Sequence, residues 1–217
     1  KIAFIPSTFL PYVGGAETQT HNVANCITER KNDVDIYVLK NTKIQNANYN
    51  IIRLNRFLIS FVFILRYYLN INLDFFLKVY FSNIQKKKKY DIWHFHSVNY
   101  KTLIYVNVLN SLNQKVIITF QGGDIQVDEK ISYGYRLDRK YELYLKSTLK
   151  KVNVFHAISK SIKDELIKLG ADEKKILIIP NCSSLKKIES IPKDNNSKKI
   201  TLLTIGRYAI KKKGFDL

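Results

Sequence analysis

The sequence predicts an α/β fold in which a Rossmann-like parallel sheet is covered by helices on both faces. Three observations predict it: short segments that are apolar throughout, longer helical segments that alternate with them, and glycine or proline at several junctions. Of the 217 residues, 46% are hydrophobic and 12% are aromatic, which is typical of a packed protein.

Each expected element follows from these patterns. Strands are expected at residues 2–6, 34–39, 51–54, 91–95, 116–120, 152–158 and 176–179. Helices are expected at residues 16–30, 57–88, 101–112, 135–151 and 160–169. Ser159 stands where the last of these helices begins, so we expect it to be the N-cap.

The composition of the chain changes near residue 180. We assign residues 1–180 to one domain and residues 181–198, rich in Ser, Lys, Asp and Asn, to a linker. Residues 199–217 begin a second α/β domain, with a strand that ends at Gly206. We therefore expect one whole domain and the first strand of another.

The chain is strongly basic, with 36 Lys and Arg against 18 Asp and Glu and a formal charge of +18. This excess favours anionic partners such as nucleic acid, anionic lipid or phosphorylated small molecules, although a biased composition explains it as well. No nucleic-acid-binding motif is present, so no nucleic-acid partner is expected. Cys26 and Cys182 belong to no cluster, which fits a reducing, cytoplasmic compartment.

Residues 56–89 combine an apolar run with aromatic residues and the lysine cluster Lys86–Lys89. The uncharged run from Phe57 to Leu65 is far shorter than the ~20 residues that cross a bilayer, so no transmembrane helix is expected. The segment suits a surface that docks on anionic lipid. The alternative is one or two core-packing helices whose lysines face water.

Glycine turns follow two of the expected strands. Gly14 and Gly15 precede the first helix, where they form either a cradle for a diphosphate or a tight turn with Glu17 in the first helical turn. The turn at Gln121 and Asp124 either presents backbone N–H groups and a carboxylate to a sugar, or is a turn in which Asp124 bonds its own backbone.

Histidines and basic residues complete the candidate chemistry. His94 and His96 lie on one side of the fourth strand at its carboxyl end, where we expect one to pack in the domain and the other to border the cleft. No third ligand is spaced nearby, so no metal site is expected. Arg207 and Lys213 follow the last strand and suit neutralisation of a leaving diphosphate.

The order of these segments carries more information than any one of them. Gly-Gly-x-Glu, His-x-His-Ser, Thr-x-x-Gly-x-Asp, Ile-Ser-x-x-x-Lys, Ile-Pro-Asn and Gly-Arg…Lys-Gly follow one another along the chain. The ordered set resembles the retaining family 4 glycosyltransferases of the GT-B fold, over essentially the whole chain. The resemblance implies an acceptor-side N-terminal domain followed by the start of the donor-binding C-terminal domain.

The resemblance also implies roles for individual residues. Gly14 and Gly15 approach the donor phosphates, and Arg207 and Lys213 grip the diphosphate; Lys213 is preferred to Lys212 because it directly precedes the glycine.

Further candidates surround the transferred sugar. The catalytic candidates are His96, Gln121 and Asp124, with Glu17 on the acceptor side. Gln121 replaces the histidine usual in the family, and a glutamine cannot hold an imidazolium charge.

We therefore expect an enzyme that moves a sugar from a nucleotide-diphosphate sugar to a saccharide or lipid-linked acceptor, with retention and without a metal or other cofactor. It is expected in the cytoplasm, on the inner face of the membrane. The paired glutamates of the family are absent, so the 217 residues alone are expected to be inactive. The alternative is a non-catalytic acceptor-binding module that works with a separate donor-domain partner.

Overall fold

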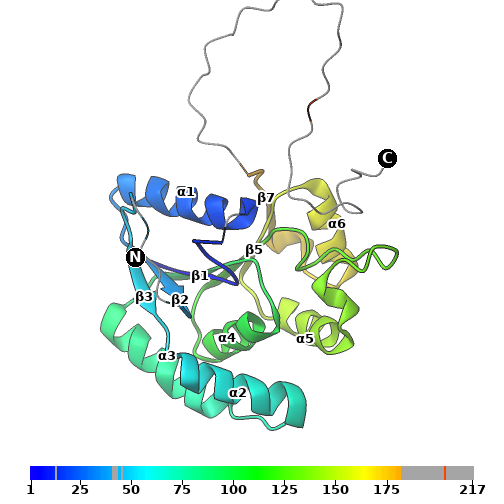
Figure 1. Cartoon of the computed structure of the whole chain (residues 1–217), viewed down its shortest axis with the longest axis horizontal. Helices are drawn as coiled ribbons and strands as arrows, with labels where there is room; N and C mark the ends of the chain where they lie inside the picture. Colours follow the sequence, from blue (N-terminus) through cyan, green and yellow to red (C-terminus); the bar gives the residue numbers. More distant parts are fainter. Residues whose placement is uncertain (13, 41–43, 45, 182–202, 204–217) are drawn as a thin grey trace, which may run out of the picture.

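The computed structural model describes residues 1–12, 14–40, 44, 46–181 and 203. Within these residues, a seven-stranded sheet has the order β3-β2-β1-β4-β5-β6-β7, and every neighbouring pair is parallel (Figure 1). The strands are β1 (Ile2–Pro6), β2 (Val34–Val38), β3 (Asn50–Arg53), β4 (Ile92–His96), β5 (Val116–Phe120), β6 (Val154–Ala157) and β7 (Ile176–Ile178). The predicted fold class is confirmed, and each strand lies within one or two residues of its expected position.

The strand order reverses next to β1. From β1 the chain proceeds to β2 and β3 on one side, then returns to β4 on the other side and continues to β7. In register, Pro6 pairs with His96, His96 with Thr119, and Thr119 with His156. Open α/β sheets bind ligands at the carboxyl ends of their strands where the order reverses, and the loops after β1, β2 and β4 meet at that place.

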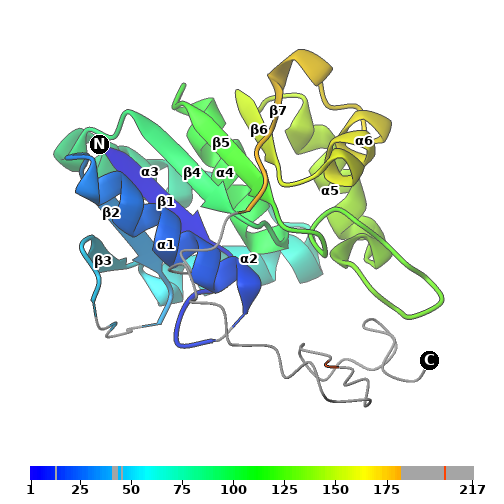
Figure 2. The same ribbon diagram turned by 90° about the horizontal axis from the view of Figure 1, so that it is seen from above.

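Helices cover both faces of the sheet (Figure 2). On one face, α1 (Gly15–Glu29) packs through Ala24 against Phe4 and Ile36. On the other, a larger core contains Trp93, Phe95 and residues of α2 (Arg56–Leu69), α3 (Asp74–Lys88), α4 (Tyr100–Ser111), α5 (Arg139–Leu149) and α6 (Lys160–Lys168). Residues alternate between the two faces along β4, so Trp93 and Phe95 enter the larger core while His94 and His96 face the side of Phe4.

Two expected helices differ from the structure. Residues 57–88 form two helices rather than one, because Asn70 adopts a left-handed conformation with φ 56° and the Asn72 side chain accepts from the N–H of Asp74. Arg66 then pairs with Asp74 at 2.5 Å across the turn. The helix expected at 135–151 begins only at Arg139, after a short 3₁₀ turn at Tyr135–Leu137, since the Asp138 side chain caps it.

The N-cap role predicted for Ser159 is confirmed, because its hydroxyl accepts from the N–H of Ile162 at 3.3 Å. No helix in the part of the chain that the structure describes is long and apolar enough to cross a membrane. The proposed linker and second domain fall almost entirely outside the described residues, so these domain boundaries stay predictions.

Candidate active site

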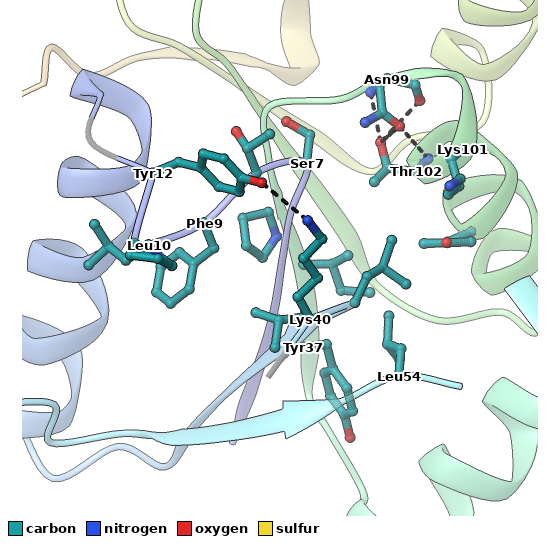
Figure 3. Close-up of a pocket in the computed structure, with 17 residues that line it drawn as sticks. Ser7, Phe9, Leu10, Tyr12, Tyr37, Lys40, Leu54, Asn99, Lys101 and Thr102 are labelled. Carbon is teal, nitrogen blue, oxygen red and sulfur yellow. Dashed lines mark hydrogen bonds between the residues drawn. The ribbon is translucent and has the colours of Figure 1, made fainter. Parts of the chain in front are cut away.

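A cavity of about 410 Å³ opens at the carboxyl edge of the sheet, beside the reversal of strand order (Figure 3). Its walls come from residues 5–12 after and within β1, residues 37–40 of β2 and its loop, Leu54, and residues 99, 101, 102 and 105 at the start of α4. The volume falls in the range of about 300–1,000 Å³ that small-molecule sites occupy. We call it the β1–β2 cavity.

A second cavity, of about 580 Å³, adjoins the first. The two share Ser7, Leu39, Asn99 and Lys101 in their walls. The remaining wall of the second cavity comes from Phe63, Tyr67 and Tyr68 of α2, from Tyr100 and Tyr141, and from residues 134, 135 and 138. We call it the α2 cavity; together the two form a two-lobed site rich in aromatic side chains.

Two lysines stand at this site without a carboxylate partner among the described residues. Lys40 Nζ lies 3.3 Å from Tyr12 Oη, as Figure 3 shows, and Lys101 Nζ lies 4.8 Å from the centre of the Phe63 ring. Burial, and then the nearby charge of Arg56, lower the pKa of Lys101. An anion beside Lys101 would offset this cost, so the site is suited to a negatively charged ligand.

The α1 N-terminus lies next to this region. Gly14 is its N-cap, with extended φ −157° and ψ 165°, and no side chain caps the first turn. Neither Gly14 nor Gly15 has a backbone conformation that requires glycine, but a Cβ atom on Gly15 would meet no atom within 4 Å. Open space therefore lies beside Gly15 at a helix end whose N–H groups favour anions, whereas a Cβ atom on Gly14 would collide with the Glu17 carboxylate.

Glu17, placed on the acceptor side by sequence, is tied to the loop after β1. Its Oε1 accepts from the Thr8 hydroxyl at 2.5 Å. Burial raises the pKa of Tyr135, and the carboxylates of Asp124 and Glu17 raise it further. Tyr135, whose backbone N–H donates to the carbonyl oxygen of Gly123 in the turn after β5, thus lies within electrostatic reach of both carboxylates.

The turn after β5 is organised by Asp124, whose residue is only 1% exposed. Its carboxylate accepts from the backbone N–H groups of Gln121 at 3.0 Å, Gly122 at 2.9 Å and Val98 at 3.3 Å. Burial raises the pKa of Asp124 to about 6 despite these hydrogen bonds. Of the two arrangements expected from sequence, the structure has the turn in which Asp124 bonds backbone, and it adds a link to the loop after β4.

Gln121 is the candidate that keeps an unused donor. Its Oε1 accepts from Asn181 at 3.0 Å, while its Nε2 is buried and has no hydrogen-bond partner in the described chain. Asn181 is the asparagine of the Ile-Pro-Asn motif. A buried amide N–H₂ without a partner costs free energy, so it favours a ligand oxygen at this position.

The histidines form a partly buried polar row. His94 Nε2 lies 2.7 Å from Thr119 Oγ1, which lies 2.8 Å from His156 Nδ1. His156 Nε2 in turn lies 2.6 Å from the carbonyl oxygen of Ile179. His96 is 4% exposed, stacks beside Phe4 and His94, and has no hydrogen-bond partner for either ring nitrogen in the described chain. His96 is thus the histidine that packs in the domain, while His94 is only partly buried; neither lines either cavity.

Burial should make the fold sensitive to mild acid through His96. Burial lowers its pKa well below the ordinary value, so the folded protein keeps it neutral while the unfolded chain binds a proton below about pH 6.5. Stability is therefore lost as the pH falls. In His96→Phe, which retains an aromatic ring beside Phe4, the loss of unfolding free energy between pH 7.5 and 5.5 should be smaller by about 1.4 kcal/mol.

Urea unfolding of both proteins at the two pH values measures this difference. Asp124 acts in the opposite direction, because its raised pKa stabilises the fold as the pH falls through about 6. It is present in both proteins and cancels in the comparison. Equal pH slopes for the wild type and the variant would contradict the buried, neutral state of His96.

Sequence reasoning missed Lys40, Lys101 and His156. All three lie at or just beyond carboxyl ends of strands, so the rule that ligands bind at this edge was the available signal. Arg207 and Lys213 fall outside the described residues, and their roles stay predictions. The described part of the chain contains no group of three or more His, Cys, Asp or Glu side chains placed to hold a metal ion.

Solved structures with this fold include Anabaena HepE in complex with UDP, with a TM-score of 0.55 and 11% identity over 83% of this chain and 44% of that one. The lipopolysaccharide outer core galactosyltransferase WaaB, in its apo form, has a TM-score of 0.52 and 18% identity over 90% of this chain and 50% of its own. At these identities the likeness shows the fold alone.

Sequence comparison gives the family. The uncharacterized glycosyltransferase MJ1069 of Methanocaldococcus jannaschii is 26% identical over 227 residues, covering 95% of this chain and 55% of the relative. The chain thus spans about half the length of the relatives it matches. The model of Glycosyltransferase Family 4 matches residues 13–186, which is most of the chain, so the chain belongs to Glycosyltransferase Family 4.

Proposed function

We propose that the full-length protein transfers a sugar from a nucleotide-diphosphate sugar to a saccharide acceptor with retention of the anomeric configuration. The observation that carries the proposal is the family match over residues 13–186. HepE, which shares the fold, has been solved with UDP-glucose, which supports a nucleotide sugar as the class of donor. The two-lobed site supports a separate acceptor on this domain.

The chemistry needs charge neutralisation above all. The bond from the sugar C1 to the diphosphate oxygen breaks while a bond from the acceptor oxygen to C1 forms. Negative charge grows on the leaving diphosphate, which takes up the proton that the acceptor hydroxyl loses. We assign its stabilisation to Arg207, Lys213 and the uncapped N–H groups at Gly14 and Gly15. Fixed positive groups do this work in the proposal, which involves no metal ion.

Residues after β4 and β5 would hold the sugar. Gln121 offers its unused Nε2 to a sugar hydroxyl, and Asp124 holds the turn that positions it. His96 is buried beside Phe4 and His94, and its ring nitrogens have no protein partner in the described chain. We therefore propose Gln121 as the residue that contacts the sugar, with Asp124 and His96 as positioning residues behind it.

The two-lobed site supports one class of acceptor. Its walls are aromatic and apolar, and its two lysines have no carboxylate partner in the described chain. A lipid-linked saccharide, which carries a phosphate between sugar and lipid, matches both properties. We propose this class, with Lys101 at the junction of the lobes binding the phosphate.

Lys101→Gln is expected to raise the KM for such an acceptor about tenfold or more, because a charge-assisted hydrogen bond is lost. The KM for the donor should stay unchanged. Lys115→Gln is the matched control, since Lys115 is exposed and precedes β5 at the opposite edge of the sheet. Steady-state kinetics with each substrate varied in turn measure the effect; an equal rise in both KM values would contradict the assignment.

The experiment that tests the function itself is a donor screen on the full-length protein. Nucleotide-diphosphate sugars, beginning with UDP-glucose, are incubated with lipid-linked saccharide acceptors, and release of the nucleoside diphosphate is measured. NMR of the product reports the anomeric configuration. Absence of transfer from every donor would refute the proposal, and an inverted product would refute retention.

A further inference from the structure

The outer side of α2 carries a continuous apolar stripe. Phe57, Phe61, Ile64 and Tyr68 recur at helical spacing and are all exposed, Phe57 by 85%. The opposite side of the same helix carries the buried Ile59 and Val62. The helix is therefore apolar on two opposite sides, and only one of them is needed for the core.

The outer side of α3 continues this surface. Phe75 is 70% exposed, and Phe76 and Val79 are also exposed, while Leu77 and Phe81 on the opposite side enter the core. The turn between the helices adds further exposed apolar residues. We define the α2–α3 face as Phe57, Phe61, Ile64, Tyr68, Leu69, Ile71, Phe75, Phe76 and Val79.

The α2–α3 face is large for the surface of a folded protein, in which contiguous exposed apolar areas mark interaction sites. The two helices lie together on the outer rim of the domain (Figure 1), so the face points away from the sheet.

Positive charge borders the α2–α3 face. Exposed basic residues stand at its ends, with Arg56 at the start of α2 and Lys86, Lys87 and Lys89 at the end of α3. Lys86 follows Phe75 and Val79 along the same stripe of the helix. The only acidic residue between positions 50 and 89 is Asp74, which is paired with Arg66.

The α2–α3 face adjoins the candidate active site. Tyr68 belongs both to the face and to the wall of the α2 cavity, and Phe63 and Tyr67 of the same helix line that cavity. A molecule anchored in a surface beneath α2 would reach the α2 cavity directly. Helix α2 therefore contributes residues both to the α2–α3 face and to the wall of the α2 cavity.

We propose that the α2–α3 face docks the protein on an anionic lipid bilayer. Aromatic residues and leucine or isoleucine enter the interfacial region, while lysines and arginine at the border bind lipid headgroups. A second copy of the chain fits less well, because a symmetric contact would bring the basic borders of two copies together. Acyl chains cover the apolar stripe and anionic headgroups neutralise its border, so a bilayer satisfies both properties of the face.

The proposal deepens the proposed function, since docking on the inner face of the membrane would bring a lipid-linked acceptor to the α2 cavity. Vesicle binding nevertheless tests it without donor or acceptor. The full-length protein is sedimented with vesicles of phosphatidylcholine alone, and with vesicles of phosphatidylcholine and phosphatidylglycerol, at low and high salt. Binding is expected only to the anionic vesicles, and it should weaken at high salt.

Two variants test the two properties of the face separately. Phe61→Ser/Phe75→Ser, which leaves the core intact because both side chains are exposed, should weaken vesicle binding at least tenfold. Lys86→Gln/Lys87→Gln should also weaken it at least tenfold and reduce its dependence on salt. Ile167→Ser/Leu177→Ser and Lys150→Gln/Lys151→Gln change exposed residues elsewhere and should bind like the wild type.

Several outcomes would overturn the inference. One is equal binding to neutral and anionic vesicles, and another is no binding to either. A third is a wild-type protein that binds no vesicles and instead forms a dimer, which the Phe61→Ser/Phe75→Ser substitution abolishes. Light scattering measures the oligomeric state. Glycosyl transfer to a soluble acceptor without vesicle binding would contradict this inference alone, whereas vesicle binding without transfer from any donor would contradict the proposed function alone.

Discussion

Replacing Lys213 by alanine is expected to lower the kcat of the full-length protein by about 10²–10³-fold. The negative charge of the leaving diphosphate grows in the transition state, so a cation that binds it there contributes more to the rate than to ground-state binding. The KM for the nucleotide sugar should therefore change much less than kcat. Initial rates at varied donor concentration, with the acceptor saturating, measure both constants.

Lys212→Ala provides the matched control, because it removes the same charge from the adjacent position. Only Lys213 directly precedes Gly214, as the family motif requires, so Lys212→Ala should retain nearly full activity. A loss of rate that is equal in the two variants would indicate a general effect of charge. Full activity in Lys213→Ala would remove the residue from the diphosphate grip.

Asp124→Ala is expected to lower the free energy of unfolding by about 3–5 kcal/mol, the largest effect on stability among these variants. The substitution leaves the buried N–H groups of Gln121, Gly122 and Val98 without their acceptor. Asp124→Asn keeps one oxygen that can accept and should lose less. Urea unfolding of the full-length protein measures the series.

The same variants separate a positioning role from direct catalysis. If Asp124 acts by holding Gln121, Asp124→Asn should lose activity roughly in proportion to its loss of stability, and acceptor and donor KM values should rise together. A direct catalytic role predicts a different result, in which Asp124→Asn folds with normal stability and loses about 10³-fold in kcat with unchanged KM values. The burial of Asp124 favours the first result.

The sheet was predictable from the sequence for a physical reason. Strands of a parallel sheet are buried on both faces, so their residues are apolar throughout and stand out from the helical segments. Segments such as 2–6 and 116–120 therefore match the structure residue for residue. The contact between the Gln121 and Asn181 side chains, in contrast, was not predicted, because the motif order does not tell which motifs meet in space.

The side-chain environment was less predictable. Aromatic residues on α2 occur on two opposite sides, and periodicity alone does not tell which side faces the core. The sequence around a turn aspartate such as Asp124 does not tell whether its carboxylate is exposed or buried. Lys101 is one of 36 basic residues, and only the fold shows that it stands between two cavities.

The hydrogen bond from Val98 to Asp124 has a consequence for engineering. The loop after β4 leads through Asn99 into the start of α4, where Lys101 lines both cavities. The same loop donates the backbone N–H of Val98 to Asp124 in the turn after β5. Any residue other than proline can supply that donor. Grafting residues 99–105 from another family member should therefore change the preference for the acceptor. The hydrogen bond between Val98 and Asp124, and the sugar side of the site that Asp124 organises, should stay unchanged.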